Sequence, residues 1–192
     1  MSNSSDASGQ RVALCVALAA FVFQFEAFQM VVALPSVTEQ LGMTQAQGAL
    51  TLVLYLLAAT VTFIPAGRWA DRNGLRKGFA AGAGILCAGA LLCGLSPSAA
   101  VLLAARLVQG VGGGCLASLG YALIPARLPR ERIGAAMGFV SFAAAAGLMT
   151  GAPVGGFLTS ALSWRWSVLA VVPLAGVLGW VSLRYVPADP PR

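Results

Sequence analysis

Charged residues are scarce in this sequence, and histidine is absent. Only 9% of the 192 residues are charged, whereas soluble domains carry roughly a quarter. Without histidine the HExxH pattern of zinc metalloproteases cannot form, and no Gly-x-Ser-x-Gly stretch suggests a serine hydrolase. We therefore expect neither an enzyme nor a bound metal or cofactor.

Cysteine is also sparse, and none of the four cysteines belongs to a paired CxxC motif. All of them lie inside apolar runs, so neither a zinc site nor a disulfide framework is indicated. We expect them to act as small packing residues. They are Cys15, Cys87, Cys93 and Cys115.

Apolar residues make up 58% of the chain and fall into six runs, each about 20 residues long, enough to cross a bilayer. These runs are continuous rather than alternating, and helices satisfy their own backbone groups in lipid, so an all-α membrane protein is predicted. The first run is longer than the apolar core of a signal peptide and is interpreted as a retained helix. The six segments are residues 12–34, 48–67, 78–95, 98–126, 133–158 and 166–186. Together they form a predicted bundle over 12–186, between a polar tail at 1–11 and a Pro-rich tail or linker start at 187–192.

Lysine and arginine gather on one side of the predicted bundle. Ten lie on the side of the amino terminus and one, Arg165, on the other. This bias predicts that both termini are cytoplasmic in a multi-pass protein of the plasma membrane, with the bacterial inner membrane favoured. Because the basic residues occupy short loops rather than one stripe, no nucleic-acid partner is expected. The ten are Arg11, Arg68, Arg72, Arg76, Lys77, Arg127, Arg130, Arg132, Arg184 and Arg192.

A weak internal repeat relates the two halves of the bundle. Pro35 and Pro125 end the first and fourth segments, and Pro65 and Pro153 lie near the ends of the second and fifth, at offsets of 90 and 88 residues. An odd number of spans separates the copies, which is the pattern of a three-plus-three inverted repeat.

Two ionisable residues, Glu26 and Arg106, lie deep in the apolar segments. Both are expected about 12–13 Å from the outer ends of their helices, at 1.5 Å per residue. Buried charges in membranes normally pair or line a polar path. Glu26 is predicted to bind and release a proton as its distance to Arg106 changes, although a purely structural ion pair is an alternative. Candidate polar residues around the same cavity, each of which could instead be an ordinary interhelical contact, are Gln24, Gln29, Tyr55, Gln109 and Tyr121.

The loop after the second segment carries an ordered pattern of glycine, acid and base. It reads Gly67-Arg-Trp-Ala-Asp71-Arg72-Asn-Gly74-Leu-Arg76-Lys77, and Gly74 permits a turn with positive φ. This stretch resembles the cytoplasmic loop motif of the major facilitator superfamily, G-x-x-x-D-R-x-G-x-R-K. The resemblance implies half of a major facilitator fold, with Asp71 helping to latch the cytoplasmic side.

Other segments resemble elements of the same superfamily. Arg106-Leu-Val-Gln-Gly110 is similar to its R-x-x-Q-G element, in which the Arg is tied to proton transfer. The end of the first segment, from Glu26 to Pro35, resembles an element of drug:proton antiporters with Glu in place of Asp. The fifth segment resembles the antiporter G-P-x-x-G-G element with its proline displaced by one place. The expected helix-packing residues are Gly110, Gly147, Gly151, Pro153, Gly155 and Gly156.

The resemblance implies proton-coupled export of small amphipathic molecules by alternating access, with protons and a small-molecule substrate as partners. Family members ordinarily have two such bundles, so a second six-helix half or a second copy of this chain is expected as a partner within the lipid bilayer. Two alternatives remain at this point. One is proton-coupled uptake of a nutrient or metabolite, and the other is a truncated half or subunit that does not transport.

Overall fold

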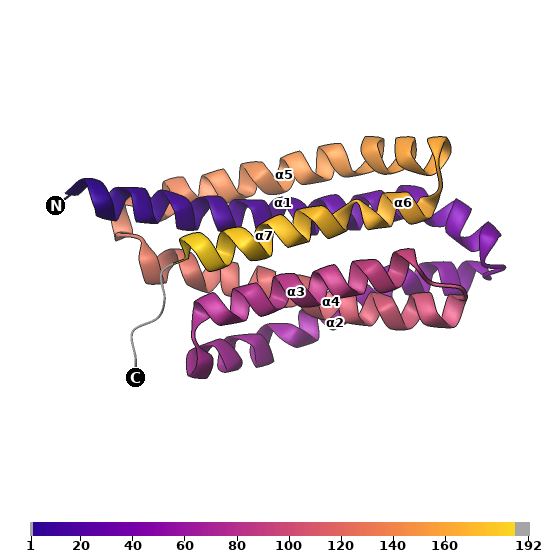
Figure 1. Cartoon of the computed structure of the whole chain (residues 1–192), viewed down its shortest axis with the longest axis horizontal. Coiled ribbons are helices and arrows are strands. Elements are labelled where there is room, and N and C mark those ends of the chain that lie inside the picture. The colour runs from indigo at the N-terminus through magenta and orange to yellow at the C-terminus, as the bar shows by residue number, and fades with distance from the viewer. Residues whose placement is uncertain (1, 187–192) are drawn as a thin grey trace.

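The computed structural model describes residues 2–186, with side chains from residue 9 onward, and consists of antiparallel helices (Figure 1). Six of the described spans are long and apolar enough to cross a membrane, which confirms the predicted all-α membrane fold. The helices are α1 (Ser2–Gln40), α2 (Gln45–Asn73), α3 (Leu75–Gly94), α4 (Ala99–Arg127), α5 (Arg130–Ala161), α6 (Trp164–Leu169) and α7 (Val171–Tyr185).

The helices extend beyond the apolar runs that predicted them. Helix α1 starts at Ser2, so its backbone continues through the stretch predicted as a polar tail, and the predicted tail at 187–192 lies outside the described residues. A hydropathy run stops at the first polar residue, whereas a helix ends at its cap. Helix α2 shows this: Thr44 caps its start, with Gln47 N–H donating to Thr44 Oγ1 at 3.2 Å and Thr44 N–H donating to Gln47 Oε1 at 2.9 Å.

The sixth predicted segment is interrupted at Ala170, between α6 and α7. Pro173 lies three residues further on. A proline has no N–H to donate to the carbonyl group four residues earlier, here that of Leu169, and its ring crowds that carbonyl. The break is therefore a proline kink within one span from Trp164 to Tyr185.

Helix pairing follows the predicted inverted repeat. Helix α1 packs mainly on α5, while α4 packs on α2 and α3. In the inverted repeat, α1 corresponds to α4 and α2 corresponds to α5. The repeat therefore relates the packing of α1 on α5 to the packing of α4 on α2. Figure 1 shows α5 beside α1, with α7 lying between them and the group of α2, α3 and α4.

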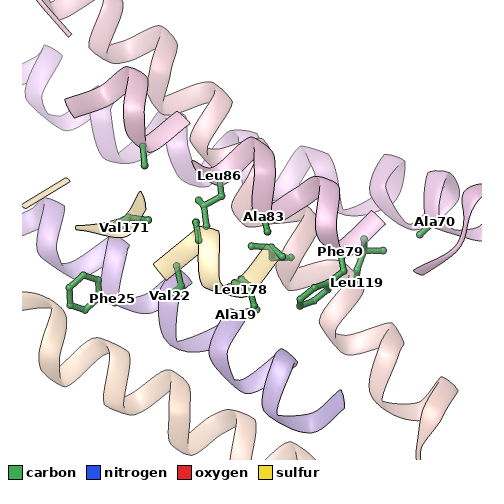
Figure 2. Close-up of a cluster of buried hydrophobic side chains, with 13 residues drawn as sticks. Ala19, Val22, Phe25, Ala70, Phe79, Ala83, Leu86, Leu119, Val171 and Leu178 are labelled. Atoms are coloured by element: carbon green, nitrogen blue, oxygen red, sulfur yellow. The ribbon is translucent and has the colours of Figure 1, made fainter. Parts of the chain in front are cut away.

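The largest buried apolar cluster joins these two groups of helices (Figure 2). Val22 and Phe25 of α1, Leu86 of α3 and Leu178 of α7 contribute to it, and each is at most 5% exposed. The outer faces are apolar as well: Ile64, Phe142 and Met149 are 68–72% exposed. A surface of this kind requires lipid or another apolar partner.

Candidate functional site

The structure brings Glu26 of α1 and Arg106 of α4 into direct contact. One guanidinium nitrogen (Nη1) of Arg106 lies 3.1 Å from Oε1 of Glu26, and both residues are 1% exposed. The two segments that carry them are separated by two spans in the chain. A charged pair shielded from water in this way must be satisfied almost entirely by protein groups.

Arg106 is held by three further groups. Its Nε donates to the carbonyl oxygen of Thr51 on α2 at 3.0 Å, and its Nη1 donates to Oε1 of Gln109 at 2.8 Å. The guanidinium also lies over the ring of Tyr55, 4.3 Å from its centroid. Planar, multi-donor binding combined with stacking on an aromatic face suits arginine rather than lysine.

Several polar atoms of this cluster have no hydrogen-bond partner among the described residues. They include one carboxylate oxygen of Glu26, one guanidinium nitrogen of Arg106, the hydroxyl of Tyr55 and the amide nitrogen of Gln109. The amide oxygen of Gln29, one turn beyond Glu26 on α1, is also unpaired. Buried polar groups normally find partners. The cluster therefore holds both donors and acceptors that a proton or a polar ligand could engage.

The five polar residues predicted to line one cavity divide between two places. Gln29, Tyr55 and Gln109 are buried with the ion pair. Gln24 and Tyr121 instead line a cavity of about 400 Å³ bounded by α1, α2, α4 and α5. The two places adjoin, because Phe23, which lines that cavity, contacts the ring of Tyr55 at a centroid distance of 5.6 Å.

Two contacts of the cluster were not predicted. The thiol of Cys93 on α3 donates to Oε1 of Gln109 at 3.1 Å, so this cysteine does more than fill space. Nε of Arg106 donates to the backbone carbonyl of Thr51. Every residue has such a carbonyl, so the sequence could not have predicted this contact. Segment depth gave no signal for the first contact, because Cys93 lies at the end of α3 whereas Gln109 lies ten residues into α4.

The predicted loop motif is largely helical. Gly67 to Asn73 form the last turns of α2, and α3 starts again at Leu75, so only Gly74 lies between the helices. Gly74 has φ 99° and ψ 143°, as its predicted role in a turn requires. Asp71 and Arg72 are exposed, together with Lys77 in the first turn of α3. The motif was predicted as a loop between two helices, but the helix ends continue past the apolar runs, so only Gly74 connects them.

Arg76 connects this corner to the last helix. Its guanidinium donates to the carbonyl oxygen of Leu183 near the end of α7. A cation at that place also interacts favourably with the partial negative charge of a helix carboxyl terminus. The α2–α3 turn is thereby attached to the carboxyl end of the neighbouring helix α7.

Glycines let the paired helices approach to backbone contact. A Cβ atom at Gly151 would lie 2.5 Å from the carbonyl oxygen of Phe25, and one at Gly155 would lie 2.8 Å from Cα of Gln29. At Gly110 it would meet the backbone carbonyl of Tyr55. Gly147 abuts the backbone of Phe21 in the same way. The last two motif positions differ, because Gly156 abuts only the side chain of Val32 and Pro153 is exposed.

The family profile described as "Major Facilitator Superfamily" matches residues 14–192. An "Uncharacterized MFS-type transporter" of Mycobacterium tuberculosis is 34% identical over 88% of this chain and 29% of its own length. Proteins named "Putative multidrug resistance protein MdtD", from Escherichia fergusonii and Escherichia coli, are 35% identical over 78% of this chain and 32% of theirs.

Six apolar helices with a buried ion pair between them define a multi-pass membrane protein built as a transporter bundle. With the profile match, the chain belongs to the Major Facilitator Superfamily, a family of membrane transporters. It spans about a third of the length of the curated relatives that it matches.

Proposed function

We propose that this bundle belongs to a proton-coupled exporter of small amphipathic molecules that works by alternating access. The observation that carries the proposal is the buried contact between Glu26 and Arg106. The multidrug-resistance names of two relatives support export of amphipathic compounds. Because those relatives are about three times as long as the matched region, transport is proposed for an assembly with a second six-helix bundle or a second copy of this chain.

The coupling would act through the partners that Arg106 keeps. If Glu26 takes up a proton, its attraction for the guanidinium is lost. Arg106 would still donate to Thr51 and Gln109 and stack on Tyr55, so its charge would not be left unsatisfied. The carboxyl group can therefore separate from the guanidinium at a moderate energetic cost, and a conformational change that separates or rejoins them would bind or release a proton.

The orientation is proposed from charge. Nine of the basic residues within 9–186 lie at the end of the bundle where α1 starts and α7 ends, and Arg165 lies at the other end. Basic residues near membrane-spanning segments favour the cytoplasmic side. We therefore place that end, and both chain termini, in the cytoplasm of a cell whose plasma membrane holds the protein.

Substitution of the carboxyl group tests the proposal. The protein, with whatever second bundle accompanies it in its membrane, is reconstituted into vesicles, and uptake of a cationic dye is followed while a pH gradient is applied. Glu26→Gln removes the titrating group but keeps shape and polarity, so dye movement driven by the gradient should fall at least tenfold. Glu39→Gln makes the same change at an exposed position of α1 and should have no effect.

The direction of transport decides between export and uptake. Dye that accumulates in inverted vesicles when the interior is acidic supports antiport, whereas co-movement of solute and protons in one direction supports uptake. Gradient-driven transport that persists in Glu26→Gln at normal protein abundance would refute proton coupling through this pair.

A further inference from the structure

The thiol of Cys93 lies at the edge of the ion-pair cluster and reaches Arg106 through one intermediate side chain. It donates to Oε1 of Gln109 at 3.1 Å, and the same oxygen accepts from Nη1 of Arg106 at 2.8 Å. Cys93 and Gln109 are both 0% exposed. The thiol therefore has a polar acceptor within an otherwise apolar cluster that includes Met30 and Leu102.

Helix packing sets the distance between this thiol and the amide group. Gly89 lies one turn before Cys93 on α3, and a Cβ atom there would lie 2.5 Å from Cα of Gln109. The two helices touch through backbone at that point, and residues four apart on a helix share a face. The close approach lets a side chain as short as that of cysteine reach the amide oxygen.

The amide group of Gln109 can take two orientations, and only one of them suits Arg106. With its oxygen toward the guanidinium, the amide accepts from Nη1. After a half-turn its NH2 group would face the guanidinium, and two donors would oppose each other. Nε2 of Gln109 has no hydrogen-bond partner among the described residues, so no bond from the nitrogen holds the amide in place. Its orientation depends on the donors at its oxygen, which are Arg106 and Cys93.

We propose that Cys93 is a positioning residue for Arg106, because its thiol holds the Gln109 amide with the oxygen toward the guanidinium. The role matters most when Glu26 takes up a proton, a step that rests on the proposed function. The carboxylate then no longer attracts the guanidinium, and the acceptors that remain outside Glu26 are the Thr51 carbonyl and the Gln109 amide oxygen. An amide free to turn would leave the buried cation with one of these, and buried charges without enough partners are costly.

Transport assays with three cysteine variants test the role. Cys93→Ala removes the donor, whereas Cys93→Ser keeps a hydroxyl donor. Cys87→Ala is the control, because Cys87 also lies on α3 but its thiol donates to the backbone carbonyl of Val172, outside the ion-pair cluster. Each variant is reconstituted with whatever second bundle accompanies the protein in its membrane. Dye transport is measured with a pH gradient and, separately, as exchange of dye for dye without one.

We expect Cys93→Ala to lower gradient-driven transport about fivefold, the effect of one hydrogen bond, and Cys93→Ser to restore most of it. Exchange without a gradient should be unchanged, because it needs no proton uptake by Glu26. Cys87→Ala should change neither rate. An equal fall of both rates in Cys93→Ala would indicate a general packing role and overturn the proposal. A serine variant no more active than the alanine variant would do so too.

The behaviour of Glu26→Gln separates this proposal from the proposed function. A Glu26→Gln variant without gradient-driven transport, beside a fully active Cys93→Ala variant, would refute the positioning role alone. Normal gradient-driven transport in both variants would refute the proposed function, together with any role of Cys93 in it.

Infrared spectroscopy of the purified protein tests the hydrogen bond itself without transport. The S–H stretching band lies in a region where other protein groups do not absorb, and hydrogen bonding lowers its frequency. The two bands are identified by their loss in Cys93→Ala and Cys87→Ala. The Cys93 band should lie at the lower frequency, because its thiol is 3.1 Å from its acceptor and that of Cys87 is 3.8 Å away. Gln109→Leu should raise it. A Cys93 band at the frequency of a free thiol, or one that Gln109→Leu leaves in place, would overturn the proposal.

Discussion

The glycine face of α5 allows a stability prediction that does not depend on transport. A Cβ atom at Gly151 would lie 2.5 Å from the carbonyl oxygen of Phe25 and 3.0 Å from its Cα. The obstacle is backbone, so no side chain can rotate away. Helix α5 would have to move from α1 by roughly 1 Å, and overpacking of this kind costs about 1–3 kcal/mol.

Gly138 provides a matched control on the same helix. A Cβ atom there would meet nothing within 4 Å. Gly138→Ala should therefore be neutral or stabilise by up to about 1 kcal/mol, because alanine favours helix. The two variants should therefore differ by about 1–4 kcal/mol, and at roughly 2–4 °C per kcal/mol for a domain of this size Gly151→Ala should melt about 2–16 °C below Gly138→Ala.

The measurement is thermal unfolding of purified protein in mild detergent, followed by the fluorescence of a thiol-reactive dye. A second substitution tests the same packing contact independently. Once α5 has moved, Gly147→Ala, which abuts the backbone of Phe21, should cost less than it does alone. Equal melting temperatures for Gly151→Ala and Gly138→Ala, or strictly additive losses at Gly147 and Gly151, would refute packing through this face.

Three further substitutions have defined outcomes. Arg106→Lys keeps the charge but cannot reproduce bonds from two guanidinium nitrogens to three acceptors, so gradient-driven dye transport should fall about tenfold; full activity would mean that charge alone suffices. Gly74→Ala places a side chain on a backbone with φ 99° and should lower the free energy of unfolding by about 1–3 kcal/mol. Gly84→Ala is its control, because a Cβ atom there meets nothing within 4 Å, and equal melting curves for the two variants would contradict the prediction. Asp71→Asn should leave melting unchanged, because the residue is exposed, yet alter the labelling rate of a cysteine introduced at Tyr121; unaltered labelling would argue against a latch.

The helices were predictable because each apolar run has one viable structure in lipid. The depth argument also placed Glu26 and Arg106 at one level, and the structure joins them at 3.1 Å. Helix ends were less predictable, since caps such as Thr44 lie outside the apolar runs. The kink at Ala170 could have been inferred from Pro173, because a proline inside a span removes a helical hydrogen bond.

Contacts between helices were the part that the sequence could not supply. Whether Gln24 joins the ion pair or a neighbouring cavity depends on the rotation of α1 against α4, which composition does not encode. Arg106 donates to the backbone carbonyl of Thr51, and a sequence motif specifies side chains rather than backbone groups. Likewise, the bond from Arg76 to Leu183 joins segments more than 100 residues apart.

The pairing of α1 with α5 has a consequence for biosynthesis. Phe25 and Gly151, which touch through backbone, are 126 residues apart in the chain. At roughly 5–20 residues per second, the ribosome needs about 6–25 s to make the second after the first. During that interval the first helix lacks its main packing neighbour. Shielding of the acidic span would therefore matter most until the fourth helix supplies Arg106.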